Sequence, residues 1–207
     1  MIRYSDLDGR KNAFIFELDD VLYPEKDYWL QVYYLFSSFL EYTEMMDAKA
    51  ATELMTNTYL AEGKQMVFDN LKSKFNLDEK YRTNFNHLSR TAKLPLKLLL
   101  YQDMLKLLQE IVIDRKQIFI VTNGDPELQL NKIKQTEWHG LEQYLICYFA
   151  NETAPKPETD CIDLMIHQHS LQRKNLIMFG NSDIDAHCAE ASGIDFVKMN
   201  EFKPIRS

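Results

Sequence analysis

Four short apolar runs, none of them interrupted by polar residues, limit what this 207-residue chain can fold into. They lie at 13–16, 117–121, 145–149 and 176–179, and a weaker fifth run lies at 195–198. Such runs are typical of parallel strands in a sheet that is covered on both faces. Helical patterns near 126–136, 157–169 and 183–192 separate the later runs. The sequence therefore predicts an α/β fold with a Rossmann-like, doubly wound parallel sheet.

The long stretch between the first two apolar runs carries no strand pattern. Segments such as YWLQVYYLFSSFLEY place apolar residues at helical spacing instead. We therefore predict an all-helical domain at 25–99, inserted into a core domain formed by 1–24 and 100–207. Aromatic side chains of this segment either line a substrate pocket or pack in the core of a helix bundle, and we favour the core. They are Tyr28, Trp29, Tyr33, Tyr34, Phe36 and Phe39.

The balance of charges excludes some classes of partner. The chain has 24 Lys and Arg against 31 Asp and Glu, a formal net charge of −7. A general nucleic-acid binder needs a basic face for its phosphate contacts, so we expect no nucleic-acid partner. No run approaches the roughly 18 apolar residues of a membrane span, and the N-terminus is polar where a signal peptide would be apolar. We expect a cytoplasmic protein without a membrane partner.

The first strand runs into a loop with three acids in four residues, Glu17, Asp19 and Asp20. Like charges this close are unfavourable unless a metal ion or a ligand offsets their repulsion. Glu17 and Asp19 share one side of an extended chain, because successive side chains alternate. One carboxylate that attacks and one that moves protons suit phosphate-ester hydrolysis through a covalent intermediate. The alternative is an acidic turn that caps a helix near Pro24.

The loops after the second and third strands carry residue types that bind phosphate. Thr122, Asn123 and Gly124 offer a hydroxyl and backbone N–H groups at the start of a helix. A simple N-cap and turn would give the same pattern. Lys156 lies between two prolines just before a helix, and its charge would neutralise a phosphate held at the acidic loop. The ordinary alternative is an exposed surface lysine.

The fourth strand ends in the polar loop Gly180-Asn181-Ser182-Asp183-Ile184-Asp185. Taken in order, the four loops resemble the signature motifs of the haloacid dehalogenase (HAD) superfamily of hydrolases. FELDDVLYPEKDY is similar to the family's first motif, DxDx[TV], and TNG is similar to its second. APKP resembles the KP motif, and GNSDID resembles GDSxxD. The resemblance covers nearly the whole chain, including the inserted helical domain, which corresponds to the family's cap.

The resemblance implies a role for each matched residue. The family's nucleophile and its acid/base map to Glu17 and Asp19, and the residues that bind and stabilise the phosphoryl group map to Thr122, Asn123 and Lys156. The resemblance also implies Mg²⁺ as the cofactor. Its ligands would be Glu17, Asp19, Asn181 and Asp185, with Asp183 as a local substitute. A small phosphorylated metabolite is the implied substrate.

Two positions depart from the family pattern. Glu17 stands where the family has Asp, and its extra C–C bond adds roughly 1.5 Å. A misplacement of about 1 Å at a reacting atom costs on the order of 100-fold in rate. Asn181 is neutral where the family has an acidic Mg²⁺ ligand, so we expect weak Mg²⁺ binding or none. Two functions stay open: a phosphatase of weak activity, and an inactive relative that binds a phosphorylated ligand or a protein partner.

Overall fold

The computed structural model describes residues 3–199, which divide into two compact units. Among the described residues, the sheet unit consists of 3–24, Leu99–Gln129 and 136–199. The helical unit consists of Glu25–Leu98 and Leu130–Gln135. The sequence predicts the segment 130–135 in the core domain. The structure groups it with the helical unit instead. This segment contains the buried Lys132, whose contacts with Glu25, Tyr28 and Trp29 lie within the helical unit.

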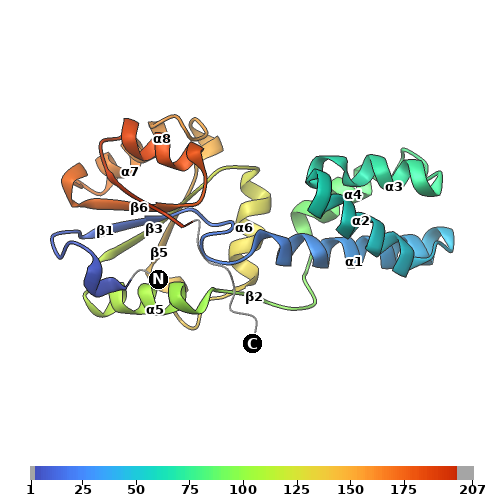
Figure 1. Cartoon of the computed structure of the whole chain (residues 1–207), viewed down its shortest axis with the longest axis horizontal. Helices are drawn as coiled ribbons and strands as arrows, with labels where there is room; N and C mark the ends of the chain where they lie inside the picture. Colours follow the sequence, from blue (N-terminus) through green and yellow to red (C-terminus); the bar gives the residue numbers. More distant parts are fainter. Residues whose placement is uncertain (1–2, 200–207) are drawn as a thin grey trace. The chain divides into compact units, whose positions relative to one another are not determined.

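Five parallel strands form the sheet in the order β5-β3-β1-β6-β7. They are β1 (Ala13–Phe16), β3 (Gln117–Thr122), β5 (Leu145–Phe149), β6 (Leu176–Gly180) and β7 (Asp195–Lys198). Helix α5 (Gln102–Ile113) covers one face, and α7 (Asp160–Gln168) and α8 (Asp183–Ala191) cover the other (Figure 1). The structure thus confirms the predicted α/β fold and places all five apolar runs in the sheet.

Burial on both faces explains why β1 has no polar residue. All four residues of β1 have no solvent exposure. Ala13 and Ile15 face a cluster that includes Cys161 and Ile162 of α7 and Cys188 and Ala189 of α8. Phe14 and Phe16 point to the opposite face, where both rings stack on Phe179. A polar side chain at any of these positions would lose its contact with water without gaining a partner.

The register of the sheet brings three strand ends to one level. Phe16 pairs with Ile120 of β3 and with Phe179 of β6. The residues that follow these three therefore emerge side by side, and the N–H of Glu17 still donates to the carbonyl of Phe179 at 2.9 Å. The chain leaves β1 toward β3 and later returns to the other side of β1 at β6. Such a switch point is where open α/β sheets bind ligands.

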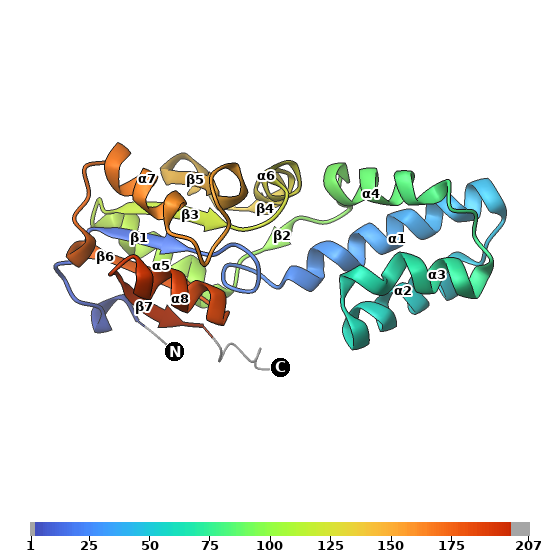
Figure 2. The same ribbon diagram turned by 90° about the horizontal axis from the view of Figure 1, so that it is seen from above.

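The helical unit contains four helices and no strand between 25 and 97. They are α1 (Glu25–Glu44), α2 (Ala48–Glu62), α3 (Val67–Phe75) and α4 (Tyr81–Thr91) (Figure 2). Most aromatic residues of α1 pack in the core of the helical unit. Phe36 contacts Phe68 and Phe85, and Tyr33 stacks on Trp29. Tyr34, in contrast, is 56% exposed. Core packing therefore accounts for most of the aromatic residues of α1.

The remaining elements are short, apart from one helix that both units share. They are β2 (Leu98–Leu99), β4 (Thr136–Glu137) and five 3₁₀ helices at Tyr4–Asp6, Lys64–Met66, Glu142–Tyr144, Ala150–Glu152 and Arg173–Asn175. Helix α6 (Pro126–Gln135) contributes its first residues to the sheet unit and its last six to the helical unit. No helix within residues 3–199 combines the length and the apolar character that crossing a membrane requires.

A buried lysine holds the end of α6 in the helical unit. The Lys132 side chain is only 1% exposed, and its Nζ lies 3.7 Å from Glu25 Oε1. The same ammonium lies over the rings of Tyr28 and Trp29, at 5.4 and 5.8 Å from their centroids. Glu25 also pairs with Lys64 at 2.7 Å. Although burial raises the pKa of Glu25, the charges of Lys132 and Lys64 outweigh it and lower that pKa.

We expect Glu25→Gln to lower the free energy of unfolding by about 2 kcal/mol at pH 7, because it removes the negative charge that faces a buried ammonium. Lys64→Gln is the matched control; its side chain is 43% exposed, so its effect should stay below about 1 kcal/mol. A lowered pKa stabilises the fold above the unfolded value of about 4.3. The loss in Glu25→Gln should therefore shrink as the pH falls through the folded pKa. Urea unfolding at several pH values measures this, and equal losses in both variants would contradict it.

Candidate active site

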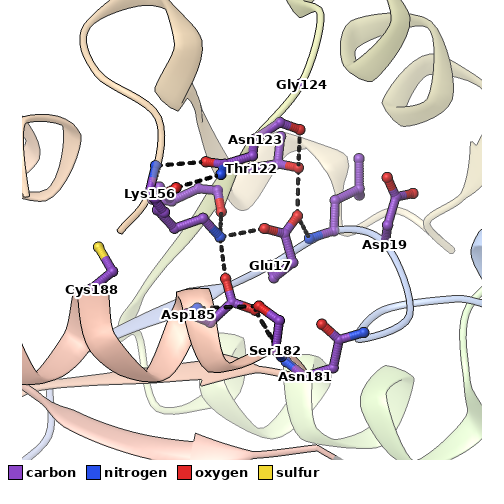
Figure 3. A network of polar contacts seen from close by, with 12 residues as sticks. Glu17, Asp19, Thr122, Asn123, Gly124, Lys156, Asn181, Ser182, Asp185 and Cys188 are labelled. Carbon is purple, nitrogen blue, oxygen red and sulfur yellow. Dashed lines mark hydrogen bonds and ion pairs between the residues drawn. The ribbon is translucent and has the colours of Figure 1, made fainter. Parts of the chain in front are cut away.

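Four buried polar side chains meet at the carboxyl end of the sheet. Glu17 follows β1, Thr122 ends β3, Lys156 precedes α7, and Asp185 lies in the first turn of α8. Their exposed fractions are 8%, 0%, 3% and 2%. Figure 3 shows the Lys156 side chain between those of Glu17 and Asp185. The structure thus brings together four of the residues that the sequence had singled out.

Both carboxylate oxygens of Glu17 are engaged. Oε1 accepts hydrogen bonds from Thr122 Oγ1 at 2.5 Å and from the backbone N–H of Leu18 at 2.7 Å. Oε2 forms an ion pair with Lys156 Nζ. The longer glutamate side chain therefore still reaches the two residue types expected to bind a phosphoryl group. A ligand at Glu17 would have to share or replace these contacts.

The ammonium of Lys156 has three acceptors for its three N–H groups. Besides Glu17, it contacts Asp185 Oδ1 at 2.5 Å and the carbonyl of Val121 at 3.2 Å. Asp185 Oδ2 in turn accepts from Ser182 Oγ at 2.7 Å and from the N–H groups of Asn181 and Ser182, each at 3.2 Å. This second set forms the N-terminal cap of α8. Both oxygens of Asp185 are thus engaged, one with Lys156 and the other with the start of α8.

The glycine before this loop makes room for Asp185. A Cβ atom at Gly180 would lie 2.4 Å from the Cβ of Asp185, far inside contact distance. Any larger residue at 180 would displace the carboxylate that holds Lys156. The glycine at the end of β6 is therefore explained by the close approach of the Asp185 side chain to the strand.

One ammonium between two carboxylates leaves an excess negative charge, which is reflected in the three pKa values. Burial raises the pKa of Glu17, and the charge of Asp185 raises it further, against the opposing effect of Lys156. Burial would raise the pKa of Asp185 too, but Lys156 and the Ser182 hydrogen bonds lower it. Burial would lower the pKa of Lys156, but the two carboxylates raise it. Glu17 is therefore the carboxylate that is easier to protonate.

Asp19 joins the site through a residue that the sequence analysis missed. Its Oδ1 accepts from Tyr23 Oη and its Oδ2 from Gln129 Nε2, both at 3.1 Å. Gln129 also donates to Thr122 Oγ1 at 2.7 Å. The only signal in the sequence was a glutamine one turn into α6, seven residues after Thr122, on a side of the helix that the fold buries.

Asn123 fixes the loop that carries Lys156. Its Nδ2 donates to the carbonyl of Lys156 and its Oδ1 accepts from the N–H of Lys156, both at 2.9 Å. The next residue, Gly124, donates its N–H to Asn151 Oδ1 at 2.8 Å. The side chain of Asn123 is thus engaged with the backbone of Lys156, and it positions that lysine against Glu17.

A family model for haloacid dehalogenase-like hydrolases matches residues 14–199 of this chain. The chain belongs to this family. The match includes all four loops of the site and the whole helical unit, so the resemblance of the motifs is confirmed. No curated protein sequence matches the chain.

Solved structures share the HAD fold at low sequence identity. A hydrolase from Streptococcus pneumoniae is 15% identical, with a TM-score of 0.54, over 91% of this chain and 92% of that one. A Bacillus subtilis protein described as a HAD hydrolase, solved with magnesium bound, is 15% identical, with a TM-score of 0.61, over 94% and 90%. The L-2-haloacid dehalogenase of Xanthobacter autotrophicus is 14% identical, with a TM-score of 0.52, over 91% and 77%.

The donor set of this HAD site does not fit a tightly held divalent cation. Within residues 3–199, no three His, Cys, Asp or Glu side chains are grouped so that they could hold a metal ion. Both oxygens of Glu17 and of Asp185 are already engaged with protein donors. Asn181, at the position of the family's acidic ligand, offers a neutral amide. Mg²⁺ prefers charged oxygens, and the charge here is offset by Lys156 instead.

Two substitutions in the buried cluster should have opposite effects on stability. Asp185→Asn should lower the free energy of unfolding by about 3 kcal/mol at pH 7, because it weakens a buried ion pair. Glu17→Gln should leave that free energy unchanged or raise it. A raised pKa stabilises the fold only below the unfolded value of about 4.3, and that contribution is lost as the pH rises through the folded pKa. Urea unfolding at pH 4 and pH 8 tests both. A large loss at pH 8 in Glu17→Gln would contradict our assignment of the excess charge.

We expect the unaltered protein to bind Mg²⁺ with a dissociation constant in the millimolar range, on the order of 10⁻³ M, because its donor set carries little free charge. Asn181→Asp should tighten binding by about tenfold, since ligand charge tunes affinity at such sites. Asp183→Asn is the control: Asp183 is exposed and paired with Lys198, so its change should have little effect. Titration calorimetry measures all three. Micromolar affinity in the unaltered protein would point to Asp183 or Asp185 as a replacement ligand.

Proposed function

We propose that this HAD hydrolase cleaves the phosphate monoester of a small metabolite through a covalent acyl phosphate on Glu17. The observation that supports this most directly is the set of contacts to the Glu17 carboxylate. A buried ammonium and a buried hydroxyl both touch it, from Lys156 and Thr122. These groups neutralise and orient phosphoryl oxygens around an attacking carboxylate.

In the proposed reaction an oxygen of Glu17 attacks phosphorus while the bond from phosphorus to the ester oxygen breaks. Protonated Asp19 gives its proton to the leaving oxygen, which departs as an alcohol. Asp19 then takes a proton from water as that water attacks phosphorus, and inorganic phosphate and Glu17 are released. During the first step Lys156 and Thr122 must turn part of their hydrogen bonding from Glu17 to the phosphoryl oxygens.

One structural neighbour supports covalent chemistry on this fold. The Xanthobacter autotrophicus dehalogenase was also solved with chloropropionic acid covalently bound. That likeness bears on the fold alone, at 14% identity. The case for phosphate in this chain rests on its own residues: a second carboxylate, Asp19, beside the attacking one, and a buried lysine with a buried hydroxyl. We propose a small substrate because the polar side chains of the site are almost fully buried.

A second function, binding of a phosphorylated ligand without turnover, is favoured by a separate observation. Both oxygens of Glu17 are already occupied, and the glutamate is one bond longer than the family's aspartate. Asn181 also removes the charge that would hold a metal ion. A site with these two changes would still hold phosphate through Thr122 and Lys156, while in-line attack on phosphorus would be slow.

A panel of phosphomonoesters, assayed with Mg²⁺ or Mn²⁺, should reveal slow hydrolysis that Glu17→Gln abolishes. Glu17→Asp should raise the rate by on the order of 100-fold if the extra C–C bond misplaces the attacking oxygen. Adding Asn181→Asp should make that rate depend more strongly on metal. The same panel with Asp183→Asn serves as the control. Hydrolysis that survives Glu17→Gln would contradict the covalent route. A protein that binds inorganic phosphate but hydrolyses nothing would favour the second function.

A further inference from the structure

Gln129 lies at the centre of the polar contacts that link the phosphate-binding and proton-transferring residues. The residue is only 2% exposed and sits in the first turn of α6. Its Nε2 lies 2.7 Å from Thr122 Oγ1, 3.1 Å from Asp19 Oδ2 and 3.0 Å from the carbonyl oxygen of Asn123. Its two N–H groups serve these three acceptors, so one N–H is shared between two of them. We infer that Gln129 is a positioning residue, which aligns Asp19 and the Thr122 hydroxyl for the proposed phosphate hydrolysis. The inference rests on that proposed function.

The neighbours of Gln129 determine which way its carboxamide faces. The carbonyl oxygen of Asn123 can only accept a hydrogen bond, so the nitrogen of Gln129 must point toward it. The hydroxyl of Thr122 already donates its single proton to Glu17, so toward Gln129 it too can only accept. Turning the carboxamide over would set its oxygen against two acceptors. The observed orientation is therefore the one that the site requires.

The contact with Gln129 fixes where the proton of Thr122 points. Because the hydroxyl oxygen accepts from Gln129, its own hydrogen is directed at Glu17 Oε1, the place where phosphoryl oxygens would arrive. The same carboxamide holds one oxygen of Asp19, and Tyr23 holds the other. One side chain thus couples the orientation of the proposed acid/base to that of the phosphate-binding hydroxyl.

The other end of the carboxamide indicates that this arrangement serves function more than stability. Gln129 Oε1 is buried, and no group among residues 3–199 donates a hydrogen bond to it. A buried acceptor without a partner is unfavourable and rare in folded proteins. An apolar side chain of similar size would avoid this penalty. A residue selected only for packing would therefore not be a glutamine here.

The first test compares Gln129→Leu and Gln129→Glu with the unaltered protein. Leu keeps the volume but removes the donor, and Glu replaces the donor with an acceptor that faces Asp19. Both should lower kcat by on the order of 10- to 100-fold with a much smaller change in KM, because substrate binding through Lys156 remains. The Tm of Gln129→Leu should fall by a few degrees at most, because the hydrogen bonds lost at its three acceptors are partly offset by removal of Oε1, which has no donor within the described part of the chain. Glu127→Gln, at an exposed position on the same helix, should match the unaltered protein in all three measurements.

A second readout does not depend on turnover. The side-chain amide signal of ¹⁵N-labelled Gln129, identified by its loss in Gln129→Leu, should shift in Thr122→Val and in Asp19→Asn but not in Glu127→Gln. A signal that shifts neither in Thr122→Val nor in Asp19→Asn would overturn the inference. An unchanged kcat in Gln129→Leu would overturn it too. So would a lower Tm that alone accounts for the lost rate. If the unaltered protein hydrolyses no phosphomonoester, the proposed function fails, and the amide signal still decides whether Gln129 positions these residues.

Discussion

The site depends on one buried ammonium that two carboxylates share. Lys156 ties together the chain after β1, through Glu17, and the start of α8, through Asp185. Charges this deeply buried are stable only when they are paired and hydrogen-bonded, so the three side chains hold one another in place. Asn123 fixes the backbone of Lys156, and the cap of α8 fixes Asp185. Of the two carboxylates, Glu17 is the one that burial makes easier to protonate, because burial raises its pKa.

The two departures from the family pattern affect the same site in different ways, because Asn181 removes a charge and Glu17 lengthens a side chain. Asn181 is neutral, and Lys156 offsets the negative charge of Glu17 and Asp185. The longer side chain of Glu17 reaches that lysine and Thr122 together. The two changes together give a site in which the ammonium of Lys156 stabilises the acidic groups. Such a site keeps the groups that we propose to bind phosphate and offers less free charge to a metal ion.

Helix α6 contributes to both compact units with two different kinds of buried polar residue. Gln129, in the sheet unit, links Asp19 to Thr122, whereas Lys132, in the helical unit, lies between Glu25 and two aromatic rings. The sequence shows only a glutamine and a lysine three residues apart on a helix. Propensity and periodicity do not identify such residues, because Asp19 and Glu25 lie more than a hundred positions away from them in the chain.

By itself the sequence determined the α/β fold, the five strands and the four loops that carry chemistry. Apolar runs and strand-end polar residues are local signals, and a parallel sheet brings its carboxyl ends to one edge. Only the tertiary structure decided that Glu17 reaches both Lys156 and Thr122. It also decided that Asp185 pairs with Lys156 and that Gln129 belongs to the site. Those contacts depend on side-chain length and on how α6 and α8 pack on the sheet. Spacing along the chain does not encode distances between residues that the fold brings together.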